Sequence, residues 1–144
     1  LEFRPADVDA RVRLAELEKG RGAGPQDLLL LYDQILRADP GRHATRRDAL
    51  AASLRLGRYT DAEAHARALV AAFPTDVELR LDLGKALAGQ QKADDARDSF
   101  EAAVQIDPTD PRPYEVLATY LWRDLRRPPD AKPVFVGHSF GGMP

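Results

Sequence analysis

The sequence predicts an all-α protein in which antiparallel helix pairs stack into a right-handed superhelical solenoid, followed by a non-helical C-terminal tail. Three observations predict this class. Prolines recur at a constant interval, apolar residues between them follow helical spacing, and capping residues stand near the ends of the expected helices. A single helix pair cannot bury its apolar side alone, so successive pairs are expected to stack and share a core.

The proline interval is the strongest of these signals. Pro40, Pro74 and Pro108 follow one another at intervals of 34 residues, and Pro5 precedes Pro40 by 35. Because proline cannot continue a helix, each of them is expected to set the turn into the next unit. A period of this length is typical of repeats that consist of two helices and a turn.

Local signals place the helix ends. Thr60 and Thr75 each precede a glutamate by three residues, which is the pattern of a capping box. Pro25 and Pro111 suit the first turn of a helix, and glycines near the expected ends suit C-caps. The seven helices that these signals predict cover residues 6–19, 25–38, 42–56, 60–73, 76–89, 93–106 and 111–125.

Residues 77–110 form the clearest copy of the repeat. Gly84 and Ala96 are small, which allows the two helices of the copy to cross closely, and Pro108 ends the second helix. The copy resembles the tetratricopeptide repeat family at Leu83, Gly84, Leu87, Ala96, Phe100, Ala103 and Pro108. The resemblance implies a repeat domain over residues 1–127, with copies at 8–42, 43–76, 77–110 and 111–127, and a non-repeat tail at 128–144.

The other copies depart from the pattern. The first keeps Leu14-Ala15 but has one extra residue in its inner loop. In the second, either Ala49-Leu50 or Leu50-Ala51 takes the central place of the first helix, and both registers remain open. The fourth starts well with Leu117-Ala118, but the glycines and prolines of the tail exclude a stable second helix.

Composition excludes several classes of function. The net charge is −2, which gives no electrostatic case for nucleic acid or a membrane surface. The sequence has no cysteine, and its three histidines, His43, His65 and His138, lack ligand spacing, so no metal is expected. No apolar run is long enough to span a membrane. We expect no cofactor, no nucleic acid and no membrane partner.

One enzyme-like motif stands in the tail. Gly137-His138-Ser139-Phe140-Gly141 matches the G-x-S-x-G nucleophile elbow of α/β-hydrolases, with Ser139 as the nucleophile. That fold needs a helix directly after the serine and an acid and a histidine later in the chain, and these are missing here. We therefore expect no enzyme. The alternative function is a repeat region fused upstream of a hydrolase and cut at its elbow.

The resemblance also implies a binding surface, because the first helix of each repeat lines a peptide groove in this family. It places Lys85 and Arg112 to pair with acidic groups, and Leu81 and Trp122 to make apolar or aromatic contacts. The candidate peptide-binding residues are Arg47, Arg55, Leu81, Lys85, Arg112, Glu115, Thr119 and Trp122. The wider set that the same pattern implies includes Val12, Glu16, Lys19, Ala51, Leu54, Glu78, Ala88 and Arg123.

The expected function is therefore a protein-interaction module that binds a partner peptide or protein in its concave groove. Some family members grip a C-terminal carboxylate through lysine, arginine and asparagine, but this chain contains no asparagine, and Glu16 and Glu78 stand at clamp places. Such a clamp is not expected. Two further hypotheses remain: a self-assembly scaffold, and a homodimer formed through the C-terminal end, where the fourth copy lacks its closing helix.

Overall fold

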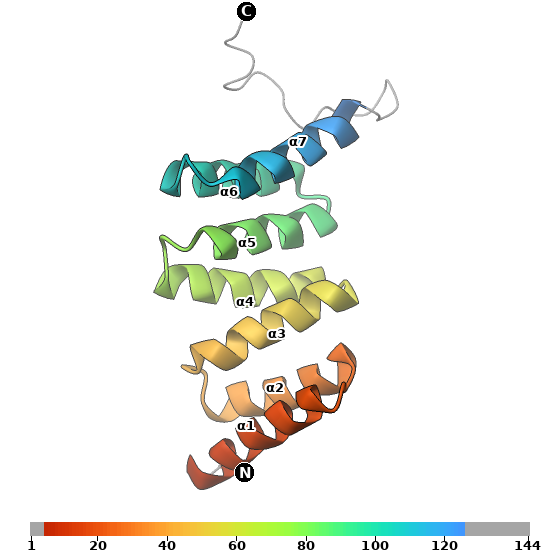
Figure 1. The fold of residues 1–144 in the computed structure, drawn as a ribbon, viewed down its shortest axis with the longest axis vertical. Coiled ribbons are helices and arrows are strands. Elements are labelled where there is room, and N and C mark those ends of the chain that lie inside the picture. Colours follow the sequence, from red (N-terminus) through yellow and green to blue (C-terminus); the bar gives the residue numbers. More distant parts are fainter. Residues whose placement is uncertain (1–4, 126–144) are drawn as a thin grey trace, which may run out of the picture. The chain divides into compact units, whose positions relative to one another are not determined.

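The computed structural model describes the backbone of residues 5–125 and the side chains of residues 7–119. The chain divides into two compact units, Leu1–Pro74 and Thr75–Pro144, and each is described by itself. Figure 1 shows the helices of each unit and the short turns that connect them. The predicted tail at 128–144, with Ser139 and the C-terminal dimer end, lies outside the described residues.

Every described element is an α-helix, so the all-α prediction is confirmed. Each helix begins and ends within one residue of its predicted position, because prolines and glycines punctuate the sequence so clearly. The helices are α1 (Pro5–Gly20), α2 (Pro25–Ala38), α3 (His43–Leu56), α4 (Tyr59–Ala72), α5 (Val77–Gly89), α6 (Ala93–Ile106) and α7 (Pro111–Leu125).

The first unit consists of α1 to α4, in which α1 pairs with α2, α2 packs on α3, and α3 pairs with α4. Its α2 begins at Pro25, and its α3 ends at Gly57, whose φ of 73° is the left-handed value that favours glycine. One apolar cluster joins the first three helices. Its buried members are Val8, Ala15, Leu28, Leu29, Tyr32, Ile35, Leu36, Ala49 and Ala52.

The register of α3 is now resolved. Ala49, Leu50 and Ser53 are buried, whereas Ala51 is exposed. The structure therefore has Ala49-Leu50 in the central place, and the alternative register is wrong. The reason is that α3 lies between α2 and α4, so the residues of α3 that face these two neighbours are buried.

The second unit consists of α5 to α7, in which α6 packs on both α5 and α7. Gly84 of α5 lies against the fully buried ring of Phe100 of α6. A Cβ added to Gly84 would lie 2.2 Å from Phe100 Cε1. The expected close crossing of these two helices is confirmed, and it depends on the absence of a side chain at Gly84.

Two predicted capping boxes are wrong. Asp76, not Thr75, is the N-cap of α5, and its Oδ1 accepts a hydrogen bond of 3.2 Å from the Leu79 amide. Thr60 lies inside α4, whose N-cap is Arg58 without a side-chain bond. The left-handed Gly57 ends α3 so sharply that α4 begins at Tyr59, one residue before the expected start.

Candidate peptide-binding surface

One side of α3 remains uncovered in the first unit. Arg47, Ala51, Leu54 and Arg55 recur at intervals of four, three and one residues, which places them on one helix face. Ala51 and Arg55 are exposed, and Arg47 and Leu54 are half-buried. We call these four residues the α3 stripe. It has a basic side chain at each end and an apolar centre.

Arg47 is held in place by an aromatic neighbour. Its guanidinium lies 5.0 Å from the centroid of the Phe73 ring, a cation–π contact. The His43 ring meets the same ring edge-on, with a centroid distance of 5.0 Å and an interplanar angle of 79°. Phe73 follows α4 directly, so the end of α4 supports the first half of the α3 stripe.

Arg55, at the other end of the stripe, is exposed to solvent. Within the described part of the chain it makes no ion pair or hydrogen bond, and its side chain is exposed. An unpaired guanidinium presents several N–H donors in a fixed plane and suits a carboxylate of a partner. Arg55 is therefore the most available cation of the α3 stripe.

Helix α1 is tied to α3 by ion pairs. Lys19 Nζ lies 3.7 Å from Asp48 Oδ1, and Arg42, directly before α3, places Nη2 2.7 Å from Asp9 Oδ1. Pairs this exposed add little stability, but they orient the two helices. Lys19 has its charge balanced by Asp48, so it is less available to a ligand than Arg55.

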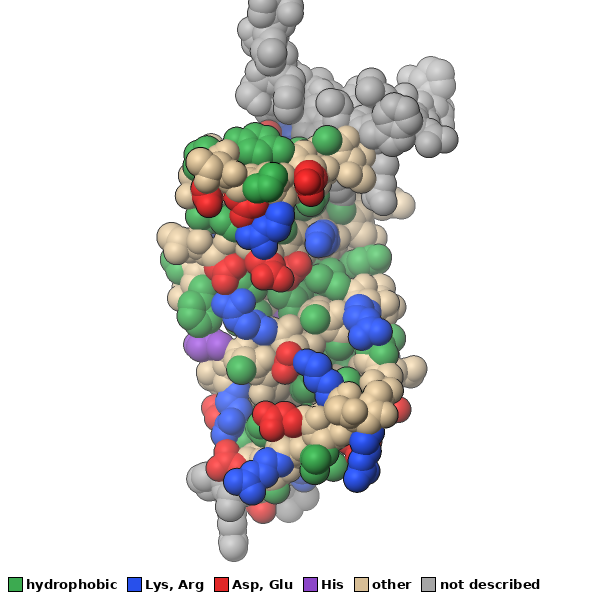
Figure 2. Space-filling model, in the orientation of Figure 1, with side chains coloured by type: hydrophobic (Ala, Val, Ile, Leu, Met, Phe, Trp, Pro, Cys, Tyr) green, Lys and Arg blue, Asp and Glu red, His purple; other side chains and the backbone are tan. Residues whose placement is uncertain are grey.

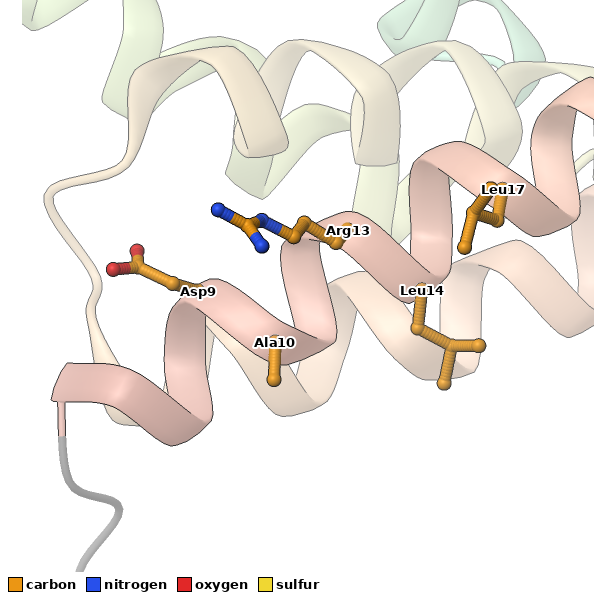
Figure 3. Close-up of a pocket in the computed structure, with 5 residues that line it drawn as sticks. All are labelled: Asp9, Ala10, Arg13, Leu14 and Leu17. Atoms are coloured by element: carbon orange, nitrogen blue, oxygen red, sulfur yellow. The ribbon is translucent and has the colours of Figure 1, made fainter.

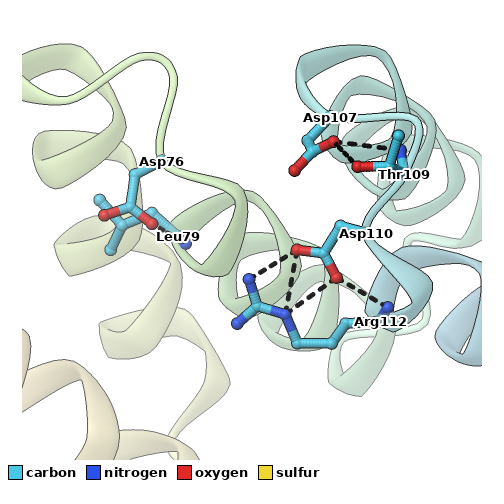
Figure 4. Close-up of polar contacts among 6 residues, drawn as sticks. All are labelled: Asp76, Leu79, Asp107, Thr109, Asp110 and Arg112. Carbon is cyan, nitrogen blue, oxygen red and sulfur yellow. Dashed lines mark hydrogen bonds and ion pairs between the residues drawn. The ribbon is translucent and has the colours of Figure 1, made fainter.

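In the second unit, Arg112 is already engaged. Its Nη2 lies 2.7 Å from Asp110 Oδ2, its Nε lies 3.1 Å from both Asp110 oxygens, and its backbone N–H donates to Asp110 Oδ1 at 2.9 Å (Figure 4). The hydrogen bonds from Arg112 lower the pKa of Asp110, and those to Asp110 raise the pKa of Arg112. This pair secures the start of α7.

The other predicted residues of the second unit differ in accessibility. Lys85 is exposed, and its Nζ lies 4.0 Å from Asp82 Oδ1. Glu115 and Thr119 are exposed on α7, where the Thr119 hydroxyl donates to the Glu115 carbonyl at 3.0 Å. Leu81 is only 4% exposed, so its assignment as a surface contact is wrong. The Trp122 side chain lies outside the described residues.

Two important residues escaped the sequence prediction. Phe73 supports Arg47, and Asp110 binds Arg112. Asp110 was predictable, because an aspartate directly before a helix-starting proline is typical of an N-cap. No local signal distinguishes Phe73 from an ordinary residue at a helix end.

Charges on the visible surface are mixed. Figure 2 shows basic and acidic side chains next to one another, with no broad patch of one sign. Among the described residues, no group of three or more histidine, aspartate or glutamate side chains is placed to hold a metal ion, and no helix has the length and hydropathy to cross a bilayer.

A recess of 350 Å³ lies elsewhere in the first unit, between α2 and α4. Its lining residues are Asp33, Leu36, Arg37, Asp61, Ala64 and His65. Arg46 Nη1 lies 3.2 Å from His65 Nδ1 and donates to it when the imidazole is neutral. Burial, and then the charge of Arg46, lower the pKa of His65, while Asp33 and Asp61 oppose the shift.

The helix pairs described above define a helical-repeat protein, and the comparison with known families identifies the repeat. The sequence profile described as tetratricopeptide repeat matches residues 47–111, which include α4, α5, α6 and most of α3. The resemblance to the tetratricopeptide repeat family that the residue pattern indicated is therefore confirmed over these residues. No curated protein sequence matches it.

Solved structures show the same fold. MamA from Desulfovibrio magneticus RS-1 (residues 41 to its end) aligns with a TM-score of 0.73 and 22% identity, over 83% of this chain and 67% of that one. MamA AMB-1 aligns with a TM-score of 0.69 and 23% identity, over 78% of this chain and 61% of that one. A third structure is the first tetratricopeptide domain of Spaghetti (RPAP3), which was solved bound to the HSP90 peptide SRMEEVD. It aligns with a TM-score of 0.66 and 17% identity, over 83% of this chain and 94% of that one. This chain spans about two thirds of the MamA chains.

Proposed function

We propose that this chain is a protein-interaction module that binds a segment of a partner protein along the α3 stripe. One observation carries the proposal: α2 and α4 bury the other sides of α3, yet Arg47, Ala51, Leu54 and Arg55 stay accessible on one face. A rigid helix face of this kind recognises a ligand without first having to become ordered, which limits the entropic cost of binding.

The chemistry of the stripe defines the ligand. Arg47 and Arg55 are eight residues apart, which corresponds to about 12 Å along a helix. Carboxylates about four residues apart in an extended segment span a similar distance. Ala51 and Leu54 between the arginines suit an apolar side chain. The ligand is therefore an extended segment with two acidic residues that flank an apolar one.

The second unit contributes less cationic charge to this proposal. Arg112 is bound by Asp110, and Lys85 lies near Asp82, so neither is a free partner for a carboxylate. Removing Arg112 from Asp110 would break several charge-assisted hydrogen bonds. We assign Arg112 a structural role at the start of α7. Lys85, Glu115 and Thr119 remain exposed candidates of the second unit for contact with a partner's polar groups.

The Spaghetti (RPAP3) domain supports peptide binding by this type of fold, since it was solved with a peptide. The same peptide is not the expected ligand here. This chain has no asparagine, and Glu16 and Glu78 are exposed at the places where the family resemblance puts clamp residues. Their negative charges repel a terminal carboxylate, so we propose an internal acidic segment as the ligand.

A selection experiment tests the proposal. A library of random heptapeptides displayed on phage is selected on the immobilised chain, and the enriched peptides are measured by fluorescence anisotropy. We expect acidic residues around an apolar one, and at least a tenfold loss of affinity in the double variant Arg47→Glu plus Arg55→Glu, because two attractive contacts become repulsive.

The matched control is Arg37→Glu, which reverses an exposed arginine of α2 outside the stripe. It should retain the affinity within about twofold, because an exposed charge far from the ligand is screened by salt. Equal losses in the control and the double variant would show that only overall charge matters. Enriched peptides that bind the double variant as well as the unchanged chain would contradict the proposal.

A further inference from the structure

The first turn of α3 places an imidazole next to the α3 stripe. His43 is exposed and precedes Arg47 by four residues, so the two side chains are neighbours on the helix surface. Both also contact the ring of Phe73, Arg47 through its guanidinium and His43 edge-on. The Phe73 ring therefore holds His43 beside Arg47, where it extends the α3 stripe by about one helical turn.

The ring nitrogens of His43 are available to a ligand. Within the described part of the chain neither of them takes part in a hydrogen bond. His65 differs, because its Nδ1 lies 3.2 Å from Arg46 Nη1. An imidazole donates from one nitrogen when it is neutral and from both when it is protonated. His43 thus presents hydrogen-bond donors to solvent from a ring that Phe73 positions.

The acidic side chains around the start of α3 are already bound by a cation. Arg42, directly before His43, places Nε 3.0 Å from Asp39 Oδ2 and Nη2 2.7 Å from Oδ1 of Asp9, a residue that Figure 3 shows on α1. The first turn of α3 contains no acidic side chain, and residues 69–72, the last turn of α4, contain no charged one. These elements leave no free carboxylate for His43.

Other carboxylates of the surrounding helices are paired or lie at a different site. Asp48 Oδ1 of α3 lies 3.7 Å from Lys19 Nζ of α1. Asp33 and Asp61 line the recess between α2 and α4 that is described above. A negative counter-charge for a protonated His43 therefore has to come from a bound partner.

The spacing of the exposed residues of α3 matches an extended ligand. His43, Arg47, Ala51 and Arg55 follow one another at intervals of four, and residues spaced in this way form one row on a helix surface, inclined to the axis. Each step along the row rises about 6 Å. Alternate residues of an extended segment point to the same side and are about 7 Å apart. Every second residue of the ligand therefore meets the next residue of the row.

We propose that the ligand of the α3 stripe carries a third acidic residue, two positions from the one that pairs with Arg47, and that the protonated imidazole of His43 binds it. This third contact rests on the proposed function, because it belongs to the same ligand. The ligand then presents an acidic, an acidic, an apolar and an acidic side chain at alternate positions, opposite His43, Arg47, Ala51 and Arg55.

The third contact makes the affinity depend on pH. Histidine side chains gain their charge between about pH 8 and pH 5, whereas the carboxylates of the ligand remain ionised over this range. Because the imidazolium and a carboxylate attract each other, the ligand and the proton each strengthen the binding of the other. An exposed charge pair contributes little, so the effect on the affinity is a few-fold.

Two synthetic heptapeptides with blocked termini test the third contact by fluorescence anisotropy. The first has glutamate at its first, third and seventh positions, leucine at its fifth, and glycine or serine at the others. The second has glutamine in place of the first glutamate and is otherwise identical. Both are also made in reversed order, because the row on α3 accepts either direction of the ligand, and the order that binds more tightly is used.

We expect the first peptide to bind about three- to fivefold more tightly at pH 5.5 than at pH 8, and the second to change by less than about 1.5-fold. His43→Gln should abolish the change for the first peptide, because glutamine keeps a donor but does not titrate. His65→Gln is the matched control and should retain the change, since His65 lines the recess between α2 and α4. Circular dichroism checks that each variant is folded at both pH values.

The outcomes separate the third contact from the proposed function. An affinity of the first peptide that does not change with pH, or a change that persists in His43→Gln or equally in the second peptide, would overturn the third contact alone. Binding would then still be lost in Arg47→Glu plus Arg55→Glu. A first peptide that does not bind, or that binds this double variant as tightly as the unchanged chain, would contradict the proposed function and the third contact together.

Discussion

At the scale of single residues, Gly84 shows how much one missing side chain contributes. An alanine Cβ there would meet three Phe100 ring carbons at 2.2, 2.5 and 2.8 Å, and the ring is fully buried. We expect Gly84→Ala to destabilise the protein by about 1 to 3 kcal/mol, because overpacking outweighs the better helix propensity of alanine. Urea unfolding measured by circular dichroism provides the free energy of unfolding.

Gly20→Ala is the control for that substitution. Gly20 also belongs to a helix, as the last residue of α1, but a Cβ added there would have open space around it. It should stabilise α1 by up to about 1 kcal/mol through helix propensity alone. Equal effects at Gly84 and Gly20 would mean that α5 and α6 do not cross as closely as described.

Two buried serines are expected to change stability in opposite directions when each is replaced by alanine. Ser53 Oγ is buried without a hydrogen-bond partner, whereas Ser99 Oγ donates to the Arg80 carbonyl at 2.7 Å. Ser53→Ala should therefore stabilise the protein by about 1 kcal/mol, and Ser99→Ala should destabilise it by about the same amount. Thermal unfolding of both variants checks the pair. Destabilisation by Ser53→Ala would reveal a hydrogen bond that the structure lacks.

His65 predicts how stability depends on pH. Its pKa in the folded protein lies below the ordinary 6.5, chiefly because of burial and then because of Arg46. As the pH falls, the unfolded chain therefore takes up the proton first. The contribution of neutral His65 is complete above pH 6.5 and is lost as the pH falls through the folded pKa.

We expect the free energy of unfolding to decrease between pH 7.5 and pH 5, and His65→Gln to reduce this slope, because glutamine can still accept from Arg46 but does not titrate. Urea unfolding at a series of pH values measures both proteins. His43→Gln is the control, since His43 is exposed and contacts Phe73 instead. An unchanged slope in His65→Gln would contradict this account.

At the scale of helices, the sequence predicted positions well and caps less well. Pro25, Gly57 and Pro111 mark helix ends because proline lacks an N–H and glycine tolerates positive φ, and the structure has helix ends at all three. The capping boxes at Thr60 and Thr75 were wrong because the conformation of the preceding turn decides which residue begins a helix. A pattern of four residues does not describe that turn.

The exposed side of each helix was harder to predict than the residues at which the helix begins and ends. The place that Arg47 takes in its repeat is taken by Leu81 in the third copy and Glu115 in the fourth. Arg47 is half-buried, Leu81 is buried and Glu115 is exposed. Equivalent residues differ in this way because exposure depends on the neighbours that pack on each helix, and on contacts such as Arg112 with Asp110 that the repeat pattern does not contain.

At the scale of the whole molecule, the regular period made the fold predictable. Within each unit, helices pack on their neighbours along the chain, as α2 does on α3 and α6 does on both α5 and α7. Interactions of this kind are close in sequence, so a pattern of 34 residues contains most of the information that the fold requires. The ligand is not part of that pattern, so the binding function depends on which side chains remain accessible.

The most direct measurement of the central claim is a map of amide chemical-shift changes when a selected acidic heptapeptide is titrated into the labelled chain. The account predicts that the largest changes cluster at Arg47, Ala51, Leu54 and Arg55, and that they disappear when Arg47 and Arg55 are both replaced by glutamate. Changes centred on α2, or spread evenly over all helices, would contradict it.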